Sequence, residues 1–247
     1  MVLALILLAG CAGTATRRRR PSVVTEDHFD QFTALQASVL TLLGLLLGFS
    51  FSMAVGRYDD RRKAEIAEAN AIGVAYERTS TLDGQSEVTA RDLMRQYVRA
   101  RIAFFEARGK RVLMEEAKGR TADLQVRLWA SGTRAARIEG NRDQAAEVAA
   151  YLTSLTQVFV VTEERQSAYE NRIPTAAWAL LIMVSAGASF MVGLGMWRWN
   201  ALLLLILPIV VSSTLTLVYD LDSPGRGLIH VRQDSMERVR QQVESGR

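Results

Sequence analysis

The 247-residue chain has little of the chemistry on which most enzymes depend. It holds one cysteine, Cys11, and two histidines, His28 and His230, which lie far apart in the sequence. A single thiol excludes an intramolecular disulfide and a thiolate metal cluster within one chain. The sequence also lacks a glycine-rich phosphate loop, a helical pair of histidines and a serine on a recognisable turn. We therefore expect a protein that is not an enzyme and that binds no metal or cofactor.

Charge is missing from three long stretches of the chain. Residues 32–55, 175–196 and 201–218 contain no Asp, Glu, Lys, Arg or His. A helix of about 20 apolar residues spans a hydrocarbon core about 30 Å thick. Aromatic residues typical of membrane interfaces stand at the ends of the last two stretches: Trp178, Trp197, Trp199 and Tyr219. The sequence therefore predicts three transmembrane helices, the last two forming a tight hairpin.

A charged segment, residues 57–172, separates the first predicted transmembrane helix from the hairpin. Its apolar residues recur at spacings of three and four, which is typical of amphipathic helices. Helix breaks are predicted at Asp83-Gly84, at Gly119 and at Gly140-Asn141. The helical pattern continues past Arg57 to about Leu82, so the first transmembrane helix is expected to run directly into this domain. The predicted fold class is an all-α integral membrane protein with an extramembrane helical bundle.

The two ends of the chain complete the predicted organisation. Residues 17–31 are interpreted as a polar loop, 32–56 as a transmembrane helix, 173–219 as the hairpin and 220–247 as a polar C-terminal tail. Residues 1–16 have two interpretations. The segment that ends at Cys11 resembles a lipoprotein signal, in which Cys11 would be lipidated. The absence of basic residues before it favours the second interpretation, a shortened N-terminal span.

Small residues recur at every fourth position in two of the predicted transmembrane helices. The first set is Gly44, Gly48, Ser52 and Gly56, and the second is Ser185, Ser189 and Gly193. Such ridges let helix backbones approach closely in lipid, either between subunits and around a pore or within one subunit. Because ionisable groups mark most pumps and these helices have none, a pump is not expected. A conduction path would be lined by hydroxyl and aromatic side chains such as that of Phe49.

The charged segment is rich in arginine, and the chain has a formal net charge of +4. Arg91, Arg95 and Arg99 fall on one helical face. This face either attracts anions or lipid headgroups, or it pairs with carboxylates on neighbouring helices, which is the commoner role of such charge runs.

Several short motifs resemble those of one known family. Residues 45–49 read LLLGF, and Arg57-Tyr58 follows; residues 68–73 then read EANAIG. The numbered residues that carry the resemblance in this block and near the C-terminus are Glu68, Asn70, Gly73, Asp222, Pro224, Arg226 and Gly227. Together they resemble the bacterial bestrophin-like membrane family of unknown function over roughly residues 35–231. The EANAIG block is the most specific part of this pattern.

The resemblance has consequences for function. Bestrophins are pentameric anion channels with a cytosolic helical domain, so it implies a channel-like build and permeation of inorganic anions. The acidic run of the bestrophin calcium clasp is absent from this sequence, so calcium gating is not expected.

The expected protein is a multi-pass protein of the bacterial inner membrane with its helical domain in the cytosol. We expect it to contact membrane lipids, to form a homo-oligomer and to bind no nucleic acid. The alternative function is a non-conducting membrane scaffold or sensor whose helical domain recruits a partner.

Overall fold

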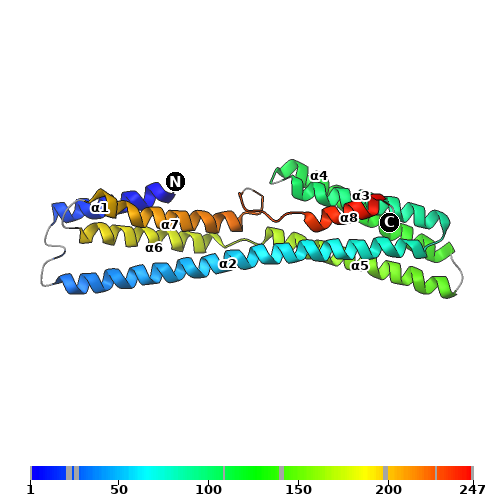
Figure 1. Ribbon diagram of the computed structural model, residues 1–247, viewed down its shortest axis with the longest axis horizontal. Coiled ribbons are helices and arrows are strands. Elements are labelled where there is room, and N and C mark those ends of the chain that lie inside the picture. The colour runs from blue at the N-terminus through cyan, green and yellow to red at the C-terminus, as the bar shows by residue number, and fades with distance from the viewer. Residues whose placement is uncertain are drawn as a thin grey trace. The chain divides into compact units, whose positions relative to one another are not determined.

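The computed structural model describes residues 2–20, 24, 28–107, 109–138, 142–196, 200–225 and 227–245. These residues are helical apart from short connections, and no strand occurs among them (Figure 1). The predicted all-α fold is therefore confirmed. The chain divides into two compact units, one formed by residues 1–56 and 172–222 and the other by residues 57–171 and 223–247.

The first unit holds the apolar helices. It contains α1 (Val2–Arg19), the first part of α2 (Phe29–Glu77), α6 (Thr175–Gly195) and α7 (Ala201–Asp222). Helix α1 packs against both α6 and α7, and α6 packs against α7. The buried core of this unit consists of Ile6, Leu43, Leu181, Ala188, Val211 and Leu215. The rings of Trp178 and Tyr219 meet edge to face, with centroids 6.0 Å apart.

Three helical segments are long and apolar enough to cross a membrane: Phe29–Thr81, Ala145–Gly195 and Leu204–Asp222. Each overlaps most of one predicted transmembrane stretch, so the integral membrane fold is confirmed. Within the subunit, only 11% of the apolar window of the first segment is buried. Most residues of this window are therefore not buried within the subunit, and their apolar side chains need lipid or another chain as their surroundings.

The second unit is a helical bundle. It contains the second part of α2, the short 3₁₀ helix η3 (Arg78–Thr81), α3 (Gly84–Glu106), α4 (Arg111–Ile138), α5 (Arg142–Glu170) and α8 (Asp234–Ser245). Its core includes these fully buried side chains: Ile72, Met94, Tyr97, Val98, Leu124, Leu128, Tyr151, Leu155, Val158, Met236 and Val243. The bundle core is continuous across five helices, which explains why the narrow apolar stripes in the sequence suffice to bury each helix.

Helix α2 is continuous from Phe29 to Glu77 and passes into η3, which confirms the prediction that the first transmembrane helix runs on without a joint (Figure 1). The break at Asp83-Gly84 is also confirmed, since α3 begins at Gly84, whose φ of +44° suits glycine. The break predicted at Gly119 is wrong, because Gly119 lies inside α4. The chain turns instead at Gly109, with a φ of +77°. The break predicted at Gly140-Asn141 falls outside the described residues.

Helix α8 was missed from the sequence, because residues 220–247 were expected to form a polar tail without helix. Met236, Val239 and Val243 recur at spacings of three and four, and all three are buried in the bundle core. The Glu65 carboxylate accepts hydrogen bonds from the backbone N–H groups of Ser235 and Met236, both at 2.9 Å. These groups are the unpaired donors at the start of α8, so a side chain of α2 caps this helix.

Candidate functional site

The small residues of α2 form a ridge on the outside of the subunit. Gly44, Gly48, Ser52 and Gly56 are all exposed, and Phe49 beside them is 63% exposed. A Cβ atom placed on any of the three glycines would meet no atom within 4 Å. Packing within the subunit therefore gives no reason for small side chains at these positions.

The small residues of α6 have a different environment. Ser185, Ser189 and Gly193 are buried. A Cβ atom on Gly193 would lie 2.1 Å from the carbonyl oxygen of Gly10 on α1, and one on Gly13 would lie 2.1 Å from the carbonyl oxygen of Phe190. These residues accordingly bring the backbones of α1 and α6 into direct contact within one subunit. Cys11, the lipidation candidate, lies inside α1, where its free thiol is partly buried.

Glu68 is the centre of a buried polar cluster in the second unit. Its carboxylate is completely buried and accepts hydrogen bonds from two arginines, Arg101 at 2.5 Å and Arg165. The Thr162 hydroxyl donates to Glu68 Oε1 at 3.0 Å, and the Tyr97 hydroxyl lies 2.8 Å from Thr162 Oγ1. One residue of the sequence motif thus joins helices α2, α3 and α5.

The surroundings of this cluster shift three pKa values. Burial alone would raise the pKa of Glu68, but the Arg101 and Arg165 guanidiniums outweigh it and hold the pKa below its ordinary value. Burial lowers the pKa of Arg165 and raises the pKa of the Tyr97 hydroxyl. The stable form at neutral pH therefore has an ionised Glu68 between two guanidiniums.

The cluster has two guanidiniums for one carboxylate. Arg101 is 2% exposed, and its Nη2 atom has no hydrogen-bond partner among the described residues. Its guanidinium lies over the rings of Phe104 and Phe105, while the Arg165 guanidinium lies 3.6 Å from the centroid of Phe105. Aromatic faces stabilise both cations in part, but the excess positive charge stays buried.

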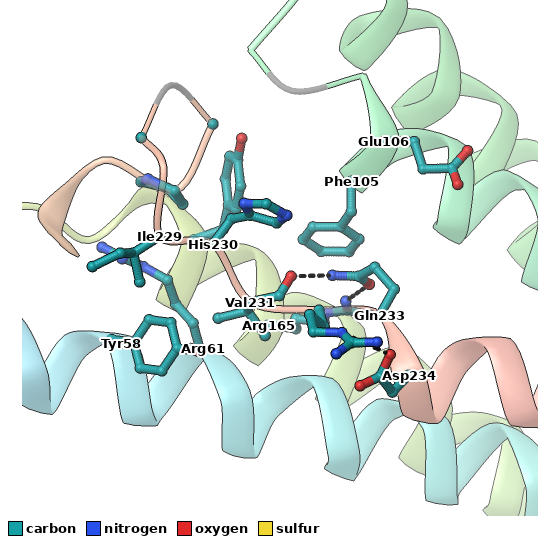
Figure 2. A pocket seen from close by; sticks show the side chains of 15 residues that line it. Tyr58, Arg61, Phe105, Glu106, Arg165, Ile229, His230, Val231, Gln233 and Asp234 are labelled. Carbon is teal, nitrogen blue, oxygen red and sulfur yellow. Dashed lines mark hydrogen bonds and ion pairs between the residues drawn. The ribbon is translucent and has the colours of Figure 1, made fainter. Parts of the chain in front are cut away.

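A cavity of about 290 Å³ lies beside this cluster in the second unit. The cavity wall is formed by α2, α3, α5 and the segment that leads into α8, as Figure 2 shows. The residues that line the cavity and bear on its chemistry are Tyr58, Arg61, Phe105, Glu106, Arg165, Tyr169, Ile229, His230, Val231, Arg232, Gln233 and Asp234. The Arg165 Nη2 group donates to Gln233 Oε1. Arg61 Nε and Nη2 donate to the carbonyl oxygens of Ala168 and Asn171, each at 3.3 Å, near the C-terminus of α5.

The other residues of the sequence motif have separate positions. Asn70 is exposed on α2, and a Cβ atom on Gly73 would lie 3.9 Å from the Gln242 side chain of α8. In the first unit, the buried Asp222 carboxylate accepts hydrogen bonds from the Ile173 N–H at 3.0 and 3.2 Å. Pro224 and Gly227 line the cavity, and Arg226 lies outside the described residues. The structure therefore brings Pro224 and Gly227 close to the Glu68 cluster.

The face of Arg91, Arg95 and Arg99 is paired. Arg91 binds Glu87 one turn away on α3, whereas the other two reach α8. Arg95 Nε donates to the Val243 carbonyl oxygen at 2.7 Å, and Arg99 forms an ion pair with Glu244 at 3.0 Å. This face serves mainly to hold α8 against α3.

Sequence reasoning missed Arg101 and Arg165 as members of the cluster. A usable signal was present, because Arg101 follows Tyr97 by four residues and Arg165 follows Val161 by four. A cation on the apolar stripe of an amphipathic helix is expected to have a buried partner. No group of three or more His, Cys, Asp or Glu side chains suited to a metal ion occurs in the part of the chain that the structure describes.

Comparison with known proteins gives a consistent result. A family model described as Bestrophin-like domain matches residues 3–236. A crystal structure of a bacterial bestrophin homologue from Klebsiella pneumoniae aligns with a TM-score of 0.71 at 12% identity, covering 99% of this chain and 96% of that chain. A variant of a bestrophin homologue from the same organism gives 0.70 at 12% identity, covering 99% and 97%. A comparison of the sequence with curated proteins found no match. At such low identity the structures show the shared fold.

Proposed function

Because the chain belongs to the Bestrophin-like family, we propose that it forms a homo-oligomeric channel of the bacterial inner membrane that passes inorganic anions. The second unit would lie in the cytosol, and the apolar helices would contact membrane lipids. The sequence motifs that resemble the family imply this function. The shared fold over 99% of the chain supports it.

The observation that carries the proposal is the exposed ridge of α2. Its four small residues, which recur at every fourth position, are exposed in the subunit, and a Cβ atom on any of its three glycines would meet no other described residue within 4 Å. Small residues in a membrane helix are most useful where another helix approaches closely or where a path needs space. A ridge that packs against nothing within its own chain is therefore best explained by other copies of the chain around a central axis.

The chemistry of α2 suits an anion more than a cation. Residues 32–55 carry no ionisable side chain, so no acidic ring can select a cation there. The protein carries a net charge of +4 and so attracts anions on balance.

Purified protein in liposomes tests this function. We expect chloride flux from the wild type and at least a severalfold change in flux for Gly48→Trp or Ser52→Trp, because both positions are exposed in the subunit and a bulky side chain there fills the ridge. Met183→Trp is the matched control, since Met183 is 65% exposed on α6. Flux that is equal in the wild type, the ridge variants and the control would contradict the proposal.

A second candidate is the non-conducting scaffold or sensor. Large apolar side chains stand exposed on α4, with Val112 79%, Val126 69% and Trp129 43% exposed. Such residues are typical of a surface that binds another protein. A monodisperse oligomer that shows no flux in liposomes, under conditions where a known channel conducts, would favour this function.

A further inference from the structure

The cavity of the second unit has walls of two kinds. One part of the wall consists of aromatic or branched aliphatic side chains, namely those of Tyr58, Phe105, Tyr169, Ile229 and Val231. Its volume of about 290 Å³ is close to the lower end of small-molecule sites. A ligand that fills it must therefore be small and must carry an apolar body to cover these walls.

The buried part of the wall is cationic. Arg165, with a side chain 3% exposed, lines the cavity next to Phe105 and shares Glu68 with Arg101. Among the described residues of this unit, three arginines and two glutamates are buried, namely Arg61, Arg101, Arg165, Glu65 and Glu68, which leaves one positive charge. The Arg101 Nη2 atom is a buried donor without a partner among the described residues. A buried charge excess of this kind is costly unless an anion lies near it.

The nearby acids do not remove this preference. Glu65 also attracts Arg165, but its Oε1 atom accepts two hydrogen bonds from the first N–H groups of α8. Asp234 is 61% exposed in its side chain and pairs with Arg232 at 3.3 Å, and Glu106 is exposed. Water therefore screens Asp234 and Glu106, whereas Glu65 is buried and directs its carboxylate to the start of α8.

We propose that this cavity binds a small organic monoanion, a carboxylate on a flat apolar body. The carboxylate would lie towards Arg165 and replace Gln233 Oε1 as the acceptor of the Arg165 Nη2 group, since guanidinium and carboxylate form strong charge-assisted hydrogen bonds. The apolar body would cover Phe105, Tyr58 and Val231. A metal cation is disfavoured by the lack of an acidic or histidine cluster in the described residues, and a bare inorganic anion would leave the apolar wall wet. The site does not depend on ion conduction.

The test uses the full-length protein in detergent with 4-fluorobenzoate as the probe. We expect fluorine NMR lines of the probe to broaden with wild-type protein and to sharpen again when benzoate is added. Benzamide, which is uncharged, and inorganic phosphate or chloride at the same concentration should not displace the probe. Val231→Trp, which fills the cavity, should weaken binding at least tenfold. Val126→Trp is the matched control, because Val126 is 69% exposed on α4 and outside the cavity.

Each contrary outcome overturns a stated part of the proposal. Equal broadening with Val231→Trp and Val126→Trp would mean that the probe binds elsewhere, or only to detergent. Displacement by benzamide as effective as by benzoate would refute recognition of the charge, and displacement by chloride or phosphate would refute the need for an apolar body. If Val231→Trp does not fold, as judged by gel filtration and thermal unfolding, Ile229→Trp replaces it. Ile229 also lines the cavity and is 36% exposed. Binding and chloride flux are measured separately, so either can fail alone.

Discussion

Glu68 is the residue on which the polar interior of the second unit depends. It is 0% exposed and binds guanidiniums from two other helices. Its negative charge therefore offsets the hydration free energy that both arginines lose on folding. Tyr97 and Thr162 extend the same network towards the bundle core. A change at this one carboxylate therefore affects three helices at once.

Glu68→Gln should destabilise the protein by about 3–5 kcal/mol, because it leaves two buried guanidiniums without a counter-charge. Glu244→Gln is the matched control. Glu244 pairs with the 62% exposed Arg99 side chain, and such surface pairs contribute at most about 1 kcal/mol. Chemical unfolding of both variants in detergent measures the difference, and equal loss of stability in the two would contradict the central role of Glu68.

The same residue predicts how stability depends on pH. Because the folded pKa of Glu68 lies below its ordinary value, its contribution is complete above the unfolded pKa of about 4.3 and is lost as the pH falls through the folded pKa. We expect the difference in melting temperature between wild type and Glu68→Gln to stay constant from pH 8 to about pH 5.5 and to shrink at lower pH. A difference that shrinks instead as the pH rises from 6 to 8 would rule out this assignment.

At the scale of elements, the contact of α1 with α6 depends on glycine. The backbones meet where Gly10, Gly13 and Gly193 face one another, and no side chain fits between them. Van der Waals contact of this kind is a main source of helix association in lipid.

Gly193→Ala should therefore weaken this contact by about 1–3 kcal/mol, as expected for an overpacked interior. Gly187→Ala on the same helix is the control, because a Cβ atom there meets nothing within 4 Å, and it should stay within about 1 kcal/mol of wild type. Thermal unfolding in detergent compares the two variants. Similar melting temperatures for both would show that α1 and α6 do not meet at Gly193.

Helix α8 is held by capping at one end and by hydrogen bonds at the other. Glu65 caps its first turn, and the Tyr76 hydroxyl donates to the Val243 carbonyl oxygen at 3.1 Å. Glu65→Ala should speed amide hydrogen exchange in residues 234–245 by about threefold to thirtyfold, which corresponds to a cap worth about 0.5–2 kcal/mol. Glu237→Ala, a change on the partly exposed surface of α8 itself, should alter this exchange less, and a larger effect there would contradict the capping role.

The sequence predicted some elements well because their signals are local. Charge-free stretches of transmembrane length marked the apolar helices, and the helical pattern that continues past Arg57 predicted the continuous α2. Helix α8 was missed because its apolar face has only three buried large residues in a polar segment, and its partners lie more than 130 residues away. Gly119 was mistaken for a break because a glycine inside an amphipathic helix looks the same in sequence as one in a turn.

The candidate site, too, was predicted from the sequence only where its signals are local. The spacing of small residues revealed the ridges on α2 and α6. It did not show that the α6 ridge packs within the subunit, because that ridge contacts α1 and no local sequence pattern encodes this contact. Glu68 was noticed as part of a motif, whereas its partners Arg101 and Arg165 come from helices whose pairing the sequence did not determine.

At the scale of the whole molecule, the apolar helices fix the location of the protein. Three segments of transmembrane length should keep it in the membrane pellet after an alkaline carbonate wash, since that treatment removes peripheral proteins but leaves spanning helices in lipid. Immunoblotting of pellet and supernatant checks this, with a known peripheral protein as the control. Release of the chain into the supernatant would contradict a spanning arrangement.

The order of the chain has a consequence for how the protein is made. The polypeptide passes from one unit to the other three times, at residues 56–57, 171–172 and 222–223. Every described helix of the first unit has been synthesised by Asp222, whereas Met236 and Val243, which belong to the bundle core, are translated after it. During biosynthesis the bundle core therefore stays incomplete until α8 is made, although the apolar part of α2 has been synthesised long before. A stop codon that removes only α8 would leave a membrane-inserted polypeptide for quality-control proteases to recognise.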